Sequence, residues 1–425
     1  MSRRAFMSPI MNPFVVALTR FCFPWLKRHL FGGLSVQIDP NDLETLRLYQ
    51  GKRMLLLPNH PTGDEPAVIF DIGMRLNEVF PFVAAREVFD WEFGFRGWVL
   101  RRLGTYSVIR GAADRESFLT TKKILMEGKH RLVIFIEGEI SRENDVLIPF
   151  EPGVLQLAYW AQESLAKEAR KAGTEDFPEI YTMPVAIKYF YKPGIETKIE
   201  KSLQGLEKAT GVTPPPDSDH YSRLRAVGEA VLRIQEEMHQ MVPLPGTTLT
   251  QRIDAMKNRV LKKMELFLDL KPKPEQSLID RMREIRNTMD RLIHTYDEPG
   301  ELTEYEKRQV NHFRMALSEF YYDLDRVACF LTYDEKYLRE NHSAERMAEM
   351  ILRLEREVFG RTLLSHPRVA MVKLGNIINL KEHFATYEAD KKGFVQRLVD
   401  QMEADMMRML ASMPHPFRET KSAQD

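Results

Sequence analysis

One histidine and two carboxylates follow a short apolar run near the start of the chain. The run Leu55–Leu57 ends at Pro58, and Asp64 and Glu65 lie four and five residues after His60. A neutral imidazole can accept a proton from a hydroxyl near pH 7, and a carboxylate on its other nitrogen fixes the tautomer. His60 is therefore a candidate general base, with either acid open as its partner. A structural histidine in a loop is the alternative interpretation.

The region around these residues alternates between strand-like and helical patterns, from Gly51 to about Tyr191. This alternation is typical of an α/β protein in which helices cover the faces of a sheet. The run before His60 is the first strand candidate, so His60 is expected at a strand end on a rigid scaffold. The strand candidates are Met54–Leu57, Phe80–Ala84, Thr105–Ile109, Leu132–Ile136 and Ile180–Ile187, and the helical candidates are Ala67–Leu76, Glu116–Glu127 and Val154–Lys171.

A long helical pattern without strand candidates follows a proline-bearing bridge at Thr213–Pro216. Apolar residues, many of them methionine, repeat there at helical spacing and are interpreted as core. A strand candidate returns at Arg368–Leu374, before a last helix around Gly393–Met413. The sequence therefore predicts an α/β core interrupted by an all-helical insertion. The expected bounds are 39–200 and 366–413 for the core, 201–365 for the insertion, and 414–425 for a tail.

The first 38 residues contain no Asp or Glu, and they combine aromatic and aliphatic side chains with several cations. Their apolar run is interrupted by Pro13, Arg20 and Pro24, so it falls short of the ~20 residues that span a bilayer. Aromatic rings favour the headgroup level, and cations favour anionic lipid. We expect residues 5–31 to form a membrane-surface anchor. The alternative is a helix packed on its own domain, and the interrupted apolar run disfavours a cleaved signal peptide.

The overall composition restricts the class of protein further. The 61 basic and 61 acidic residues balance, so net charge gives no reason to expect a nucleic-acid partner. The two cysteines exclude a disulfide framework and fit a reducing compartment. No His-Glu-x-x-His segment or Cys/His cluster predicts a metal site, and no Gly-x-Ser-x-Gly turn predicts a serine hydrolase.

Five short motifs follow one another in a fixed order and together carry more information than any one of them. They are Asn59-His60-Pro61-Thr62 with an acid at position 65, Arg101 to Gly111, Val133 to Gly138, Pro149 to Gly153, and Met183 to Ile187. This ordered set resembles the glycerolipid acyltransferases, the family of lysophosphatidic acid (1-acylglycerol-3-phosphate) acyltransferases. The resemblance covers residues 45 to 192, with a last piece at 368 to 413.

The resemblance implies an enzyme of phospholipid biosynthesis that moves a fatty acyl group from a thioester to a hydroxyl of a lysophospholipid or related lipid. The donor would be acyl-CoA or acyl carrier protein, with no covalent intermediate, metal or other cofactor. His60 would be the base, and Glu65 or Asp64 would orient it. The implied substrate-binding residues are Asn59, Thr62, Arg110, Gly111, Glu137, Gly138 and Arg142. Arg110 would bind phosphate on the acceptor, for which an arginine fork is suited, although a surface ion pair is its alternative.

Two departures from the family pattern leave the acceptor open. The family usually has Asp at the fifth position after the histidine, where this chain has Glu65 and places Asp64 one residue early. The third motif usually reads Glu-Gly-Thr-Arg-Ser, but here Glu139 adds a carboxylate, which is unfavourable beside a phosphate unless it is paired. Arg142 is the candidate that replaces the displaced cation.

The sequence thus predicts a peripheral acyltransferase on the cytoplasmic face of a membrane, with its oligomeric state open. The alternative is a catalytically impaired protein of the same fold that binds lipid or serves as a scaffold.

Overall fold

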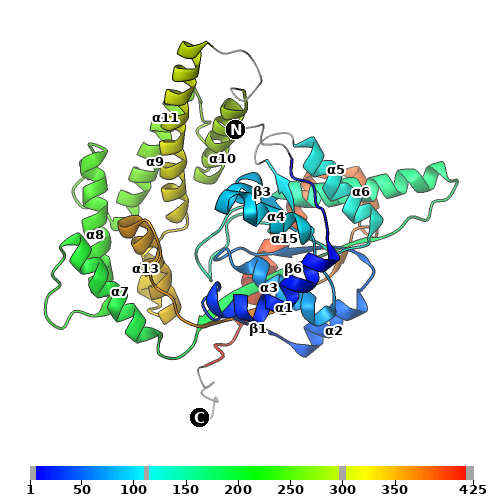
Figure 1. Cartoon of the computed structure of the whole chain (residues 1–425), viewed down its shortest axis with the longest axis horizontal. Helices are drawn as coiled ribbons and strands as arrows, with labels where there is room; N and C mark the ends of the chain where they lie inside the picture. Colours follow the sequence, from blue (N-terminus) through cyan, green and yellow to red (C-terminus); the bar gives the residue numbers. More distant parts are fainter. Residues whose placement is uncertain (1–5, 110–113, 296–302, 418–425) are drawn as a thin grey trace. The chain divides into compact units, whose positions relative to one another are not determined.

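The computed structural model describes residues 6–109, 114–295 and 303–417. Internal contacts divide the chain into two compact units. The α/β unit consists of Phe6–Ile109, Asp114–Pro193 and the residues from His366 onward, and Gly194–Ser365 form the body of the helical unit. The predicted class, an α/β sheet flanked by helices together with a helical region, is confirmed (Figure 1).

The central sheet of the α/β unit has six strands among the described residues, in the order β1-β7-β6-β2-β5, with β8 pairing on β6. β2 is parallel to both β5 and β6, β1 is parallel to β7, and β6 and β7 are antiparallel. A second sheet pairs β3 with β4. The strands are β1 (Ser35–Ile38), β2 (Arg53–Pro58), β3 (Val83–Ala85), β4 (Tyr106–Val108), β5 (Leu132–Val133), β6 (Ile180–Tyr191), β7 (Arg368–Leu374) and β8 (Ile378–Asn379).

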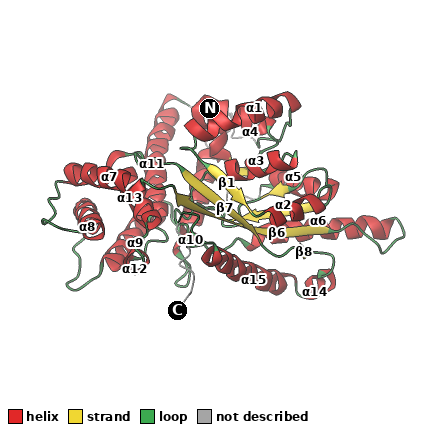
Figure 2. Ribbon diagram, turned by 90° about the horizontal axis from the view of Figure 1, so that it is seen from below, coloured by secondary structure: helices red, strands yellow, loops and turns green. Residues whose placement is uncertain are grey.

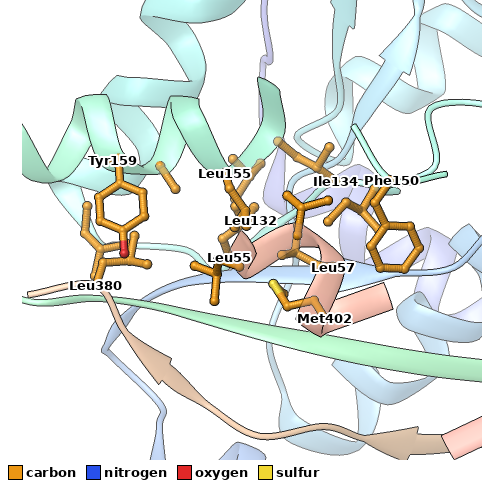
Figure 3. Packing of buried hydrophobic residues seen from close by; sticks show 14 of the residues in the cluster. Leu55, Leu57, Leu132, Ile134, Phe150, Leu155, Tyr159, Leu380 and Met402 are labelled. Atoms are coloured by element: carbon orange, nitrogen blue, oxygen red, sulfur yellow. The ribbon is translucent and has the colours of Figure 1, made fainter. Parts of the chain in front are cut away.

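The side chains of β2 are apolar on both faces of the central sheet, so both faces must be covered, and helices cover them. Figure 2 shows α1 and α15 on opposite sides of the sheet. Leu55 and Leu57 belong to a cluster with residues of α5, α6, α14 and α15, among them Leu155 and Met402 (Figure 3). Met54 and Leu56 belong to a second cluster, with residues of α1, α2 and α3. β2 is therefore held rigidly in the centre of the unit. The helices of this unit are α1 (Pro13–His29), α2 (Pro40–Leu48), α3 (Glu65–Leu76), η1 (Arg86–Gly94), α4 (Phe95–Arg102), α5 (Arg115–Glu127), α6 (Pro152–Lys171), α14 (Phe384–Ala389) and α15 (Lys391–Ser412).

The helical unit has a core of its own. Met264, Met282 and Met289 are buried between α9, α10 and α11 together with Phe320 and Leu324, so these methionines belong to the core, as the helical spacing predicts. Capping boxes begin α9 and α11, where a threonine and the residue three positions later satisfy each other's backbone N–H groups. The helices are α7 (Ile195–Thr210), α8 (His220–Met238), α9 (Leu249–Phe267), α10 (Leu278–Thr295), α11 (Glu304–Cys329), α12 (Glu335–Glu340) and α13 (Ala344–Phe359).

Candidate active site

The carboxyl end of β2 carries Asn59 and His60. β2 pairs with β6 only as far as Val185, and the buried side chain of Asn59 continues the pairing. Its Nδ2 donates to the Ile187 carbonyl at 3.0 Å, and its Oδ1 accepts from the Ile187 N–H at 2.7 Å. Asn144 pairs in the same way with Tyr189, at 3.2 and 2.8 Å. Asn59, predicted to bind substrate, therefore has its amide engaged with β6, and it fixes the backbone from which His60 projects.

The imidazole of His60 is held on two sides. Its Nδ1 lies 2.5 Å from Oε2 of Glu65, and its ring stacks on Phe135 with centroids 4.3 Å apart and an interplanar angle of 16°. The side chain is 17% exposed, and no hydrogen-bond partner of Nε2 lies in the described ranges 6–109, 114–295 and 303–417. The ring is thus oriented by the protein through one nitrogen while the other is open.

Glu65 is fully buried at the start of α3, and its carboxylate is surrounded by donors. Oε1 accepts from the Thr62 N–H at 3.0 Å and from the Thr62 hydroxyl at 2.6 Å, and Oε2 also accepts from the Gly63 N–H at 2.8 Å. Gly63 has φ +100°, a left-handed conformation that favours glycine and aims this N–H at the carboxylate. The amino end of a helix favours a negative charge as well. Thr62, predicted to bind substrate, has its hydroxyl directed to Glu65.

The protonation state of Glu65 determines which nitrogen of His60 is basic. Burial raises the pKa of the Glu65 carboxyl. The hydrogen bond from His60, the positive charge of a protonated His60, and the hydrogen bonds from Thr62 and Gly63 outweigh burial and lower this pKa to about 2. Glu65 is therefore ionised near neutral pH and can only accept hydrogen bonds. The proton of a neutral His60 then sits on Nδ1, and the lone pair is on Nε2.

Asp64, the second candidate acid, points to a different partner. Its carboxylate forms an ion pair with Arg368 on β7, whose guanidinium lies 4.5 Å from the centre of the Tyr189 ring. Burial raises the pKa of Asp64, and the charge of Arg368 opposes that effect. The two acids are thus divided between His60 and Arg368. No local pattern in the sequence points to Arg368, because it lies 304 residues from Asp64.

Glu137 supports the backbone under His60. The side chain is buried, Oε1 accepts from the His60 N–H at 2.6 Å, and Oε2 accepts from the Ile148 N–H at 2.7 Å. Burial raises the pKa of this carboxyl to about 8. The N–H of Ser141 donates to the His60 carbonyl at 3.0 Å, so the loop after β5 holds His60 from both sides of its peptide unit.

Of the remaining predicted substrate-binding residues, Gly138 and Arg142 lie in the segment that follows β5. Gly138 is exposed with φ +68°, and an added Cβ would lie 3.3 Å from Cγ of Glu151, so a larger residue would be strained there. Arg142 follows Ser141 and is partly buried, also with a left-handed φ of +62°. Arg110 and Gly111 lie outside the described residues. No group of three or more His, Cys, Asp or Glu side chains suited to hold a metal occurs in the part of the chain that the structure describes.

A histidine–carboxylate pair at the end of a buried central strand is an arrangement suited to proton abstraction from a hydroxyl. A family model described as Acyltransferase matches residues 41–188, which include this pair, the strand and the loop of Glu137. That segment is a domain of the glycerolipid acyltransferase family, so the family predicted from the ordered motifs is confirmed. A search of curated proteins gave no match to this chain.

Proposed function

We propose that the α/β unit transfers a fatty acyl group from an acyl thioester to a hydroxyl of a lysophospholipid or related lipid, with His60 as the general base. The thioester would be acyl-CoA or acyl carrier protein, and no other cofactor is proposed. The observation that carries this proposal is the Nδ1 contact of His60 with an ionised Glu65, which leaves Nε2 as the basic atom of a partly exposed ring.

The reaction proceeds in one displacement. As the acceptor oxygen forms its bond to the thioester carbonyl carbon, Nε2 of His60 takes the hydroxyl proton, and Glu65 stabilises the imidazolium. The carbon–sulfur bond breaks, and the imidazolium returns the proton to the departing thiolate. The products are the acylated acceptor and a free thiol. The family resemblance supports Arg110 as a ligand of the acceptor's phosphate and Gly111 as a neighbouring substrate-binding residue. Arg142 is proposed to supply the cation that is displaced in the third motif.

Thioester turnover tests this function. The purified full chain is offered long-chain acyl-CoA and acyl carrier protein with a panel of lysophospholipids that differ in headgroup, and with glycerol 3-phosphate. We expect thiol release that depends on one acceptor and matches the amount of acylated product. Absence of acceptor-dependent thiol release across the whole panel would favour the lipid-binding or scaffold alternative.

We also propose that the protein works as a peripheral protein on the cytoplasmic face of a membrane. None of the helices within the described ranges is long and apolar enough to cross a bilayer. α1 instead has two sides: Val16 and Phe23 are buried, whereas the opposite face exposes Phe14, Leu18, Phe21 and Trp25. These four side chains repeat every three or four residues, which makes one apolar stripe. A stripe of this kind, on a helix without acidic residues, is suited to an anionic lipid surface.

A second group of exposed aromatic residues adjoins α1. Trp91, Phe93, Phe95 and Trp98 are exposed on η1 and α4, with the Arg102 guanidinium 3.9 Å from the Trp98 ring centre. The chain before α1 is hydrogen-bonded to the end of α4, with the Ile10 N–H 2.8 Å from the Arg101 carbonyl. Aromatic rings beside arginines fit the headgroup level of a bilayer.

The four tryptophans of this chain allow the membrane proposal to be tested directly. Trp25, Trp91 and Trp98 belong to the two exposed groups, whereas Trp160 lies on α6. In variants that keep one tryptophan and replace the others by phenylalanine, we expect brominated lipids in phosphatidylglycerol vesicles to quench the three former residues strongly. Trp160 is the matched control, since it is also exposed, at 43%. Equal quenching of all four, or none, would contradict this placement.

A further inference from the structure

A polar pocket of the α/β unit lies at the end of the central sheet opposite to His60. It has a volume of about 650 Å³, and its polar lining includes Arg20, Lys52, Glu78, Lys129, His130 and Arg131. Lys52 and Arg131 immediately precede β2 and β5, whereas His60 follows β2. A strand of six residues such as β2 is about 20 Å long, so this pocket is separate from the candidate active site.

Two arginines of this pocket are fixed in place by the fold. Arg131 is buried, its Nε and Nη2 donate to one carboxylate oxygen of Glu78, and its Nη1 donates to the Leu46 carbonyl at 2.7 Å. Arg20 reaches in from α1 and donates to Oδ1 of Asn77 at 2.8 Å and to the Glu78 carbonyl at 2.9 Å. Guanidinium groups held in this way are preorganised for a ligand, because little side-chain freedom is lost when it binds.

The pocket retains binding capacity that the described residues do not use. Nε of Arg20 is buried and has no hydrogen-bond partner within the described ranges. The side chains of Lys52 and His130 are exposed and form no hydrogen bond with the residues that the structure describes. The ammonium group of Lys129 makes a long ion contact, at 3.8 Å, with the carboxylate of Glu127. A buried donor below a rim of cationic groups is unfavourable unless an acceptor is supplied from outside.

The chemistry of this pocket favours phosphate oxygens. Arginine forks and lysine ammonium groups are the side chains that bind phosphate, and one acid, Glu78, lines the pocket among five basic residues. The volume suits an organic phosphate rather than a single small ion. The apolar part of the wall includes Val16 and Ala17 of α1, together with Met11 and Val79.

We infer that this pocket binds a phosphate-bearing ligand, and that the ligand is the headgroup of an anionic phospholipid. The source is indicated by α1, which lines the pocket through Ala17 and Arg20 while its adjacent face exposes Phe14, Leu18 and Phe21. A bilayer in contact with that apolar face would bring its phosphates to the pocket mouth. The inference does not depend on acyl transfer, since it concerns the other end of the sheet.

Binding of monomeric ligands to the full chain tests this site without a bilayer. Dihexanoyl phosphatidylglycerol, below its micelle concentration, and inorganic pyrophosphate are titrated separately by calorimetry. We expect saturable binding to one site and an affinity at least tenfold lower in the Lys52→Gln/Lys129→Gln variant. Both lysines are exposed, so folding should be unaffected. The matched control, Lys171→Gln/Lys392→Gln, removes two exposed charges from the same unit and should bind like the unchanged protein.

The two probes distinguish the sources of phosphate. Tighter binding of the phosphatidylglycerol supports a lipid headgroup, whereas tighter binding of pyrophosphate assigns the pocket to a soluble phosphate compound and overturns the lipid assignment. Non-saturable binding of both, or an equal loss of affinity in the control variant, would overturn the site itself. None of these readouts uses acyl transfer, so they remain interpretable if the proposed function fails.

Discussion

Replacing His60 with alanine should lower the kcat of acyl transfer by about 10²–10⁴-fold, the range that a positioned general base contributes. The change removes Nε2, the atom proposed to take the acceptor proton, but leaves the backbone contacts of His60 with Glu137 and Ser141 in place. The KM values of both substrates should change little, because the proposed binding groups lie on other residues. Steady-state rates of thiol release, with each substrate varied in turn, measure both parameters.

Two controls separate loss of the base from loss of the fold. His312 is an exposed histidine of α11, so His312→Ala should leave turnover unchanged. Circular dichroism and thermal unfolding of His60→Ala should report an intact structure, with a modest loss of stability from the missing stack on Phe135. Wild-type turnover in a folded His60→Ala protein would refute the assignment of His60 as the base.

The main strands could be predicted from the sequence because their burial dictates their composition. β2 is covered on both faces and reads as a continuous apolar run, and β7 has the predicted bounds Arg368–Leu374. The predicted strand Leu132–Ile136 is shorter as β5, although the Ile134 and Ile136 N–H groups still donate to carbonyls of β2. β1 was not predicted, since four residues are too few to show a period and its partner is the distant β7.

The candidate site could be predicted only where its residues are close in the chain. His60 and Glu65 are five residues apart, so their contact across the start of α3 follows from local geometry. Asp64 is directed away from His60 by its ion pair with Arg368. Arg368 lies on β7, which follows the helical unit in the sequence, so this pairing is not visible in the local sequence. Asn59 and Glu137 belong to the family motifs, yet their bonds to the backbone of Ile187 and His60 depend on the three-dimensional pairing.

Glu65→Gln should slow acyl transfer by roughly 10²-fold or more, whereas Asp64→Asn should change it by less than about fivefold. Both oxygens of Glu65 accept from donors: His60 and Gly63 on one side, and Thr62 on the other. A glutamine must turn its NH2 group toward one of these sets, so it opposes N–H or O–H groups in either orientation and cannot stabilise an imidazolium by charge. In the Asp64→Asn variant, the amide oxygen would still be an acceptor for Arg368. The kcat values of the two variants, measured in parallel, make this comparison.

The pH dependence of the unfolding free energy reports how much Glu65 stabilises the fold, separately from its effect on kcat. The folded pKa of Glu65, about 2, lies below its ordinary value of 4.5, so its stabilising contribution is present above about pH 4.5 and is lost as the pH falls toward 2. The difference in unfolding free energy between wild type and Glu65→Gln should therefore shrink between pH 6 and pH 3 in urea titrations. Asp64→Asn should show no such loss, since burial raises rather than lowers the pKa of Asp64. A larger kcat loss in Asp64→Asn than in Glu65→Gln would assign the orienting role to Asp64. It would also contradict the tautomer of His60 that is inferred from its contact with Glu65.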